Sequence, residues 1–251
     1  MKEQYNPFSL QNKNILVTGA SSGIGQAIAI ECSRLGANVI ATGRNENRLK
    51  ETIFSMDKGG HKYVIADISK EEEIDKVVKE CSELDGVVHA AGIGDRTLLS
   101  MVKKNNIAKI MSVNFEAPVL LQKALIKKKK MSNEASIIFI ASRAAQVPTV
   151  GNGLYAASKA ALISYAKVLA IELADRKIRV NCIAPAMVWT ELVKRDQEIL
   201  GIDYHEKEKE YPLKRYGQPV DIAYLAVYML SNASSWMTGS CVDITGGENS
   251  L

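Results

Sequence analysis

Short apolar runs alternate along this chain with longer segments of helical periodicity. Runs rich in β-branched residues predict strands at residues 15–18, 39–42, 63–66, 87–90, 137–140, 180–183 and 242–244. Between them, apolar spacing of the helical kind predicts helices at residues 26–35, 71–81, 117–128, 156–174 and 220–230. Because strands and helices alternate, the pattern predicts an α/β fold, a doubly wound parallel sheet of about seven strands with helices on both faces.

Residues 189–218 break this alternation. The segment is charged, contains glycine and proline and shows no strand pattern, although residues 191–200 fit a short helix. Long insertions of this kind are often functional, so we interpret the segment as a substrate lid, with a solvated surface excursion as an equal alternative. No proline- or serine-rich linker divides the chain, so residues 1–251 are expected to form a single domain.

Composition and charge narrow the classes of function. The chain has 32 basic and 28 acidic residues, and its net charge of +4 is spread along the sequence, so nucleic-acid binding is not indicated. Its three histidines are isolated and lack metal-ligand spacing, so we predict no metal site. No segment has the shape of a signal peptide or the roughly 18 apolar residues of a membrane span, which predicts a cytoplasmic protein without a membrane partner.

The cysteines are far apart in sequence and include no CxxC pair. They are Cys32, Cys81, Cys182 and Cys241. This spacing favours free thiols in a reducing compartment over a disulfide framework, with burial as small apolar residues.

A glycine-rich loop joins the first predicted strand to a helix rich in alanine and isoleucine. Its candidate cofactor-binding residues are Thr18, Gly19, Ser21, Ser22, Gly23, Ile24 and Gly25. Glycines permit a tight turn and let backbone N–H groups at the start of a helix approach a pyrophosphate, whose charge the helix dipole favours. The spacing differs from G-x-G-x-x-G, but the strand–loop–helix context favours a dinucleotide site over a purely structural turn.

The residue after the second predicted strand bears on the choice of cofactor. A site for NAD usually places an acid about 20 residues beyond the glycines, on the ribose 2′-hydroxyl, whereas this chain has Arg44. A guanidinium can pair with a 2′-phosphate through two hydrogen bonds, so Arg44 favours NADP(H), with Asn45 and Thr42 assisting. Glu46 keeps NAD(H) as the less favoured cofactor, and an exposed loop arginine is the structural alternative.

Three polar residues further along fit general acid–base chemistry. Ser142 follows the fifth predicted strand, and Tyr155 and Lys159 lie four positions apart, hence on one face of the next predicted helix. An ammonium near a phenol lowers the phenol pKa from about 10 toward working pH, as proton transfer requires. Such a pair is common on helix surfaces, but its place after Ser142 and the glycine loop favours catalysis.

Together these motifs resemble the short-chain dehydrogenase/reductase family over nearly the whole chain, which implies a Rossmann-type fold. The resemblance implies a catalytic tetrad of Asn114, Ser142, Tyr155 and Lys159. In this tetrad Tyr155 transfers the proton and Ser142 holds the substrate oxygen. Lys159 tunes Tyr155 and binds the nicotinamide ribose. Asn114 supports a water relay, with a buried polar residue at a helix kink before Pro118 as the alternative.

The resemblance also implies further cofactor contacts. They are Asp67 and Ile68 at the adenine ring, Ala91 and Gly92 after the fourth strand, and Pro185, Val188 and Thr190 at the nicotinamide carboxamide. For Asp67, capping of the helix that follows is the alternative.

Two positions depart from the family pattern. Ala186 stands where the family has glycine, so a backbone conformation with positive φ is disfavoured there. His89 and Ala90 stand where the family reads Asn-Asn. We interpret His89 as a structural substitute that supplies hydrogen bonds to the sheet, rather than as a catalytic base.

The implied activity is that of an NADP(H)-dependent oxidoreductase that reduces a carbonyl group or oxidises the matching alcohol. It is most similar to 3-oxoacyl-(acyl-carrier-protein) reductases, with sugar or polyol dehydrogenases next. A catalytically silent NADP-binding regulator is the alternative from another class. The substrate is then a small-molecule or acyl-carrier-bound carbonyl compound.

The resemblance further suggests a homotetramer, with residues 236–239 and 243–247 at positions that are commonly subunit contacts. An acidic acyl carrier would find basic groups at Arg176 and at the run Lys127, Lys128, Lys129 and Lys130. Solvation and the helix dipole alone also favour a lysine run at a helix end, and this is the preferred interpretation.

Overall fold

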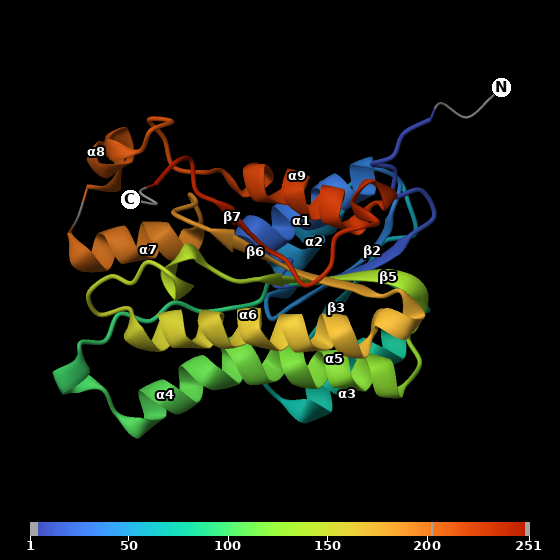
Figure 1. Cartoon of the computed structure of the whole chain (residues 1–251), viewed down its shortest axis with the longest axis horizontal. Helices are drawn as coiled ribbons and strands as arrows, with labels where there is room; N and C mark the ends of the chain where they lie inside the picture. The colour runs from blue at the N-terminus through green and yellow to red at the C-terminus, as the bar shows by residue number, and fades with distance from the viewer. Residues whose placement is uncertain (1–4, 202, 249–251) are drawn as a thin grey trace.

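The computed structural model describes residues 5–201 and 203–248. Its centre is one sheet of seven parallel strands in the order β3-β2-β1-β4-β5-β6-β7 (Figure 1). The strands are β1 (Asn14–Thr18), β2 (Asn38–Gly43), β3 (Lys62–Ile65), β4 (Leu84–His89), β5 (Met131–Ile140), β6 (Arg179–Pro185) and β7 (Cys241–Ile244). The predicted fold class is confirmed, and every predicted strand has its counterpart in the sheet.

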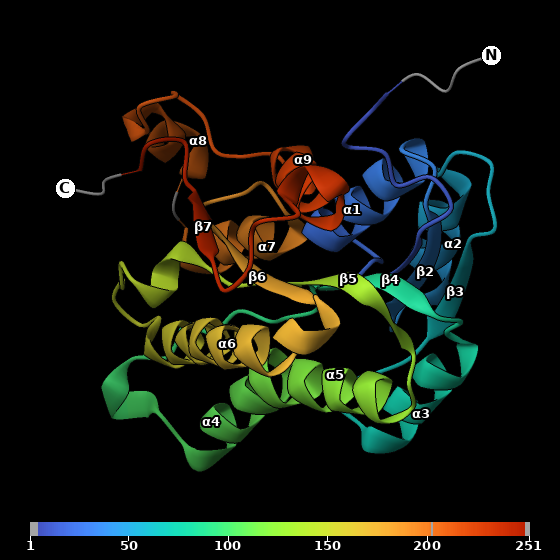
Figure 2. The ribbon, with the colours of Figure 1, turned by 45° about the vertical axis from the view of Figure 1, so that its right-hand side comes forward.

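Helices cover both faces of this sheet (Figure 2). One layer consists of α1 (Gly23–Arg34), α2 (Glu46–Phe54) and α9 (Pro219–Leu230). The other consists of α3 (Glu71–Glu80), α4 (Lys104–Met111), α5 (Ala117–Lys127) and α6 (Gly153–Glu172). Successive strand residues point to opposite faces, so Val87 of β4 packs under one layer and Val88 under the other. Because both faces of the inner strands are buried, these strands are largely continuous apolar runs.

The sequence pattern did not predict α2 and α4, because little of either helix is buried. The mostly polar α2 buries only Leu49 and Thr52, and α4 buries only Ile110. A π-helical turn (Ser112–Glu116) carries α4 directly into α5.

The segment 189–218 is more helical than expected. The short helix at 191–200 is confirmed as α7 (Glu191–Leu200), and α8 (Tyr204–Lys207) and a 3-10 turn (Glu208–Glu210) follow it, while residue 202 lies outside the described residues. Tyr204, Tyr211 and Tyr216 form an apolar cluster that is separate from the two clusters of the sheet.

The helix α6 corrects the expectation that no segment is apolar enough to cross a membrane. It is long and apolar enough to do so by length and composition alone. Core helices pass the same test, and α6 buries Leu162, Ala166 and the charged Lys159 within the structure. A single helix of this kind is weak evidence for a membrane span.

Candidate active site

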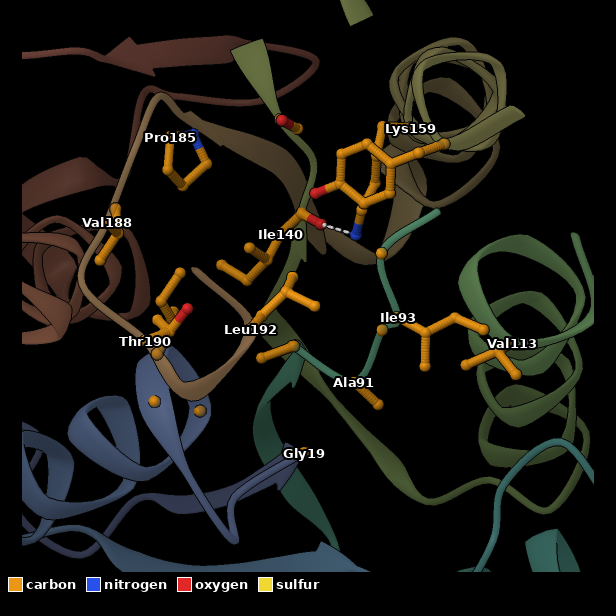
Figure 3. A pocket seen from close by; sticks show the side chains of 18 of the residues that line it. Gly19, Ala91, Ile93, Val113, Ile140, Lys159, Pro185, Val188, Thr190 and Leu192 are labelled. Carbon is orange, nitrogen blue, oxygen red and sulfur yellow. Dashed lines mark hydrogen bonds between the residues drawn. The ribbon is translucent and has the colours of Figure 1, made fainter. Parts of the chain in front are cut away.

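A cavity lies at the carboxyl ends of the strands, where the strand order changes direction. From β1 the chain continues to β2 and β3 on one side, then returns to β4 on the other side of β1. In open parallel sheets the crevice at such a switch point is the usual ligand site. The cavity has a volume of about 390 Å³ and extends from the glycine loop to α6 (Figure 3).

Nearly all the residues that the sequence singled out line this cavity. They are Thr18, Gly19, Ser21, Ser22, Gly23, Ile24, Gly25, Arg44, Asp67, Ile68, Ala91, Gly92, Ser142, Tyr155, Lys159, Pro185, Val188 and Thr190. Asn45 and Asn114 are not among the described lining residues. In Figure 3, Pro185 and Thr190 lie on one side of the cavity and Lys159 on the other.

The glycine loop needs its glycines for both conformation and space. Gly19 has φ 65° and Gly23 has φ 56°, in the left-handed region that favours glycine. A Cβ atom at Gly19 would lie 2.8 Å from the Cα of Ala91, and one at Gly25 would clash with the Gly19 carbonyl oxygen. Ser22, the N-cap of α1, makes no side-chain cap, so the N–H groups of the first turn remain for a ligand. A pyrophosphate fits this cradle.

Thr18 braces the glycine loop against the end of β4. Its Oγ1 accepts hydrogen bonds from the backbone N–H groups of Ala90 and Ala91, both at 3.1 Å. Because the hydroxyl is engaged within the protein, Thr18 contributes to the cavity by holding the loop in place.

Arg44 and Asp67 line the end of the cavity at β2 and β3. Asp67 Oδ1 accepts hydrogen bonds from the backbone N (3.1 Å) and Oγ (2.7 Å) of Ser69. Burial raises the pKa of the Asp67 carboxyl, but the Ser69 hydrogen bonds and the charge of Arg44 outweigh burial and hold it below its ordinary value. The N-cap of α3 is Lys70, so Asp67 shapes the turn before that helix without being its N-cap.

Hydrogen bonds within the protein engage the side chains of Asn45 and Thr42. Asn45 Oδ1 accepts the N–H of Arg48 at 3.1 Å and so caps α2, and its contact with a cofactor stays a prediction. Thr42 lines the cavity, but its hydroxyl donates to the Val64 carbonyl at 2.8 Å.

Tyr155 and Lys159 come from adjacent turns of α6. Tyr155 is partly exposed, whereas Lys159 is buried. Lys159 Nζ donates to the Ile140 carbonyl at 2.7 Å, the dashed line of Figure 3, and lies 5.7 Å from the centroid of the Tyr155 ring. Burial lowers the pKa of the Lys159 ammonium to about 8. A phenol at the cavity with a cation beside its ring is suited to proton transfer.

Asn114 lies behind the cavity, in the π-helical turn between α4 and α5. It is fully buried, and its amide accepts from the N–H of Ile93 at 2.8 Å and donates to the Ile93 carbonyl at 3.0 Å. Its Nδ2 also donates to Ser158 Oγ at 3.1 Å. A Cβ atom at Gly92 would lie 3.4 Å from Lys159 Nζ, so Asn114 holds the loop that passes directly over this lysine.

Ser142 lies where β5 ends at the cavity. Its Oγ accepts the N–H of Ala144 at 3.2 Å. The next residue, Arg143, pairs with Asp243 of β7 at 2.7 Å. This ion pair ties the loop that carries Ser142 to the edge of the sheet.

Beyond β6 the chain passes along the cavity from Pro185 to Thr190. Ala186 is not among the described residues with positive φ, and its N–H donates to the Ile244 carbonyl at 3.1 Å. Alanine in place of the family's glycine therefore fits the backbone conformation at position 186. Thr190 caps α7, its Oγ1 accepting the N–H of Val193 at 3.4 Å.

His89 is buried within the packing of the sheet. Its ring stacks on Phe139 with centroids 4.7 Å apart, and its Nε2 lies 3.1 Å from Gln122 Oε1. Burial lowers the pKa of His89 to about 4, so the ring is neutral at neutral pH. His89 is not among the described residues that line the cavity. These contacts support a structural role.

The lysine run lies at the opposite end of the sheet from the cavity. It ends α5 and leads into β5 at Met131, whereas β5 reaches the cavity at Ile140. Met131 pairs with Leu84 and Phe139 with His89, so the two ends of β5 are separated by the five residue steps of β4, about 17 Å. Arg176 belongs to the same end, because its Nη2 donates to the Met131 carbonyl. This placement argues against carrier docking at these basic residues.

Three residues that hold the site together were missed in the sequence. Ile93 and Ile140 act through backbone groups, which leave no trace in residue type. Ser158 acts through its hydroxyl, and its place beside Lys159 was the one available signal.

Comparisons with known proteins agree across almost the whole chain. The family profile described as enoyl-(acyl carrier protein) reductase matches residues 19–249. The chain is 34% identical to the 3-oxoacyl-(acyl-carrier-protein) reductase of Rickettsia prowazekii, over 95% of this chain and 97% of that protein. It is 31% identical to the L-xylulose reductase of Caenorhabditis elegans, over 96% of this chain and 97% of that protein.

Solved structures agree with these relatives. A short-chain dehydrogenase/reductase of Brucella melitensis, described as a glucose/ribitol dehydrogenase, matches with a TM-score of 0.90 at 27% identity, covering 98% of this chain and 100% of that one. A candidate NAD(P)-dependent gluconate 5-dehydrogenase of Beutenbergia cavernae, with bound NADP, matches with a TM-score of 0.85 at 30% identity. That match covers 96% of this chain and 98% of the other.

Proposed function

The chain belongs to the short-chain dehydrogenase/reductase family of oxidoreductases, and from this premise we propose that it reduces a carbonyl group with NADPH or catalyses the reverse reaction. Tyr155 is the general acid in reduction and the general base in oxidation. One observation carries the proposal: Tyr155 and the buried Lys159 line the same cavity as a glycine loop shaped for a pyrophosphate.

The cavity residues fit NADP(H). The glycine loop and the first turn of α1 receive the pyrophosphate, and Arg44 pairs with the 2′-phosphate. Asp67 and Ile68 border the adenine. Pro185, Val188 and Thr190 border the nicotinamide, and Ala91 and Gly92 lie between the two ends. When bound, the cofactor supplies the hydride.

The chain's own residues position the carbonyl group and move the proton. Ser142 Oγ orients the carbonyl oxygen, and Tyr155 Oη donates its proton to that oxygen as negative charge develops there. Lys159, held at the Ile140 carbonyl, favours the ionised form of Tyr155 and so makes the proton easier to release. Asn114 and Ile93 keep the loop over Lys159 in place for a chain of waters that returns the proton.

Replacement of Tyr155 by Phe tests the proposal. Because the variant keeps the ring and loses only the hydroxyl, we expect consumption of NADPH to fall at least about a hundredfold, the scale of general acid catalysis, with NADPH affinity retained. Turnover by absorbance and binding by NADPH fluorescence measure the two effects. Tyr224→Phe, at an exposed tyrosine of α9, is the matched control. Undiminished turnover in Tyr155→Phe would refute the role of Tyr155.

For the substrate, we propose a 3-oxoacyl group carried by an acyl carrier or a simpler thiol. The 34% identity to a 3-oxoacyl-(acyl-carrier-protein) reductase supports it. A keto sugar or polyol is the second candidate, supported by the likeness to L-xylulose reductase and to a glucose/ribitol dehydrogenase. NADPH oxidation with 3-oxoacyl thioesters, keto sugars and simple ketones distinguishes them. Lack of turnover with all of them would favour the silent NADP-binding regulator, against which the intact tetrad argues.

We also propose a single cytoplasmic domain that assembles as a homotetramer, with residues 189–218 as a lid. The start of α7 supports the lid, because Leu192 lines the cavity and a Cβ atom at Gly94 would lie 3.0 Å from its Cδ1. Light scattering of the purified protein measures the number of chains.

A further inference from the structure

Two cysteines that are far apart in sequence meet in the sheet. Cys182 of β6 and Cys241 of β7 are directly opposite each other in the strand register. Paired residues of parallel strands point to the same face, and both cysteines pack on the apolar cluster that α6 covers. Adjacent strands lie about 4.8 Å apart, within the range of about 4.4–6.8 Å between Cα atoms that disulfides span. Both cysteines are free thiols in this structure.

The two thiols differ in exposure and in acidity. Cys182 is buried, whereas Cys241 is partly exposed at the sheet edge. A hydrogen bond between the two sulfurs lowers the pKa of the Cys241 thiol and, together with burial, raises the pKa of the Cys182 thiol. Burial and the charge of Asp243 act in the opposite direction on the Cys241 pKa, and the charge of Lys167 adds to the lowering. Cys241 is thus the sulfur that ionises more readily and that a small oxidant reaches.

We propose that Cys182 and Cys241 are an oxidisable thiol pair that a small peroxide converts to a disulfide. The Cys241 sulfur attacks hydrogen peroxide, so an S–O bond forms, the O–O bond breaks and one oxygen leaves as water after taking the proton of the Cys241 thiol. The Cys182 sulfur then attacks the Cys241 sulfur, so the S–S bond forms, the S–O bond breaks and a second water leaves with the Cys182 proton. Peroxide gains two electrons and the thiols lose two.

The strand geometry makes this disulfide easy to reverse. Opposite Cβ atoms in parallel strands lie about as far apart as the strands, more than the roughly 3.5–4.5 Å that a relaxed disulfide prefers. The short strand β7 must therefore move toward β6, the one strand that it pairs with among the described residues (Figure 2). Strained disulfides are readily reduced, so thiol reductants restore the pair.

The expected effect on catalysis rests on the proposed function and follows from the position of the end of β6 at the cavity. Pro185, three residues beyond Cys182, lines the cavity and is the register partner of Ile244 on β7. The Ala186 N–H is hydrogen-bonded to the carbonyl of the same Ile244. A shift of β7 toward β6 therefore displaces the wall of the cavity at the nicotinamide end.

Peroxide treatment of the purified enzyme tests the pair. We expect the denatured protein to lose two of its four titratable thiols and two hydrogens in mass, and peptide mapping to show a link between Cys182 and Cys241. Cys241→Ala and Cys182→Ala should form no such link. Cys32→Ala, which removes a buried cysteine under the other helix layer, should behave as wild type.

Activity supplies a second and separable readout. We expect NADPH oxidation to fall at least about tenfold on peroxide treatment and to recover with dithiothreitol, since small displacements at a reacting centre cost rate steeply. Cys241→Ala should lose this response and keep its basal rate. Four unchanged thiols, a link between two chains, or oxidation that halts at sulfinic acid would overturn the pair. A protein with the Cys182–Cys241 link and full activity would overturn only the proposed effect of the disulfide on the cavity. The thiol count tests the disulfide even if the protein turns over none of the substrates.

Discussion

At the scale of single residues, Lys159 is a charged group that is buried at the catalytic end of the cavity. Burial lowers its pKa from 10.5 to about 8, so the unfolded chain binds more protons than the folded one between these two values. Stability therefore rises with pH across that window, and below it the folded protein carries the cost of a buried charge.

Lys159→Met should remove this contribution. As pH rises from about 8 to 10.5, the free energy of unfolding of the wild type should increase by on the order of 3 kcal/mol relative to that of the variant. This amount is the pKa shift expressed as free energy. Urea unfolding at several pH values measures the difference between the two proteins. Lys123→Met, at an exposed lysine of α5, serves as control. A difference that does not change with pH would mean that Lys159 is not buried as an ammonium.

Arg44 decides the choice of coenzyme in the proposed function. Arg44→Ala should raise KM for NADPH about tenfold to a hundredfold, because hydrogen bonds to a charged group contribute about 1.5–3 kcal/mol. KM for NADH should change little. Arg34→Ala, at an exposed arginine that closes α1, is the matched control. Equal effects on both coenzymes would place Arg44 elsewhere than at the 2′-phosphate.

At the scale of elements, the segment 189–218 contains a small apolar cluster that is separate from the two clusters of the sheet and on which Ala186 and Met187 also pack. Tyr204, Tyr211 and Tyr216 pack together, and the ring of Trp189 lies against Tyr216 with centroids 5.4 Å apart, while its Nε1 donates to Glu208 at 2.8 Å. An element with its own small core opens without unfolding the sheet.

Tyr204→Ala should therefore loosen the lid and little else. Truncation of a buried aromatic side chain costs about 3–5 kcal/mol locally, so amide exchange across residues 203–216 should accelerate at least about a hundredfold. Exchange in β1 and β4 should stay as slow as in wild type. Hydrogen exchange with mass spectrometry measures both, beside Tyr224→Ala as the exposed counterpart. Equal acceleration in the sheet would show that the lid and the sheet unfold together.

At the scale of the whole molecule, the strands and most of the cavity could be predicted from sequence because each depends on local pattern. A strand buried on both faces is an apolar run, and the glycine loop and the pair Tyr155 and Lys159 are short motifs. Contacts between distant strands leave no such pattern. The register that sets Cys182 beside Cys241 was invisible for this reason, as was the brace from Thr18 to the end of β4.

The π-helical turn at residues 112–116 has one further consequence, for the phase of the helix around it. An α-helix rotates by about 100° per residue, so a chain shorter by one residue in this turn would swing everything before it by that angle relative to α5. The Asn114 amide would then no longer meet Ile93. The position of the Asn114 amide in this enzyme therefore depends on the number of residues in the turn as well as on the asparagine itself.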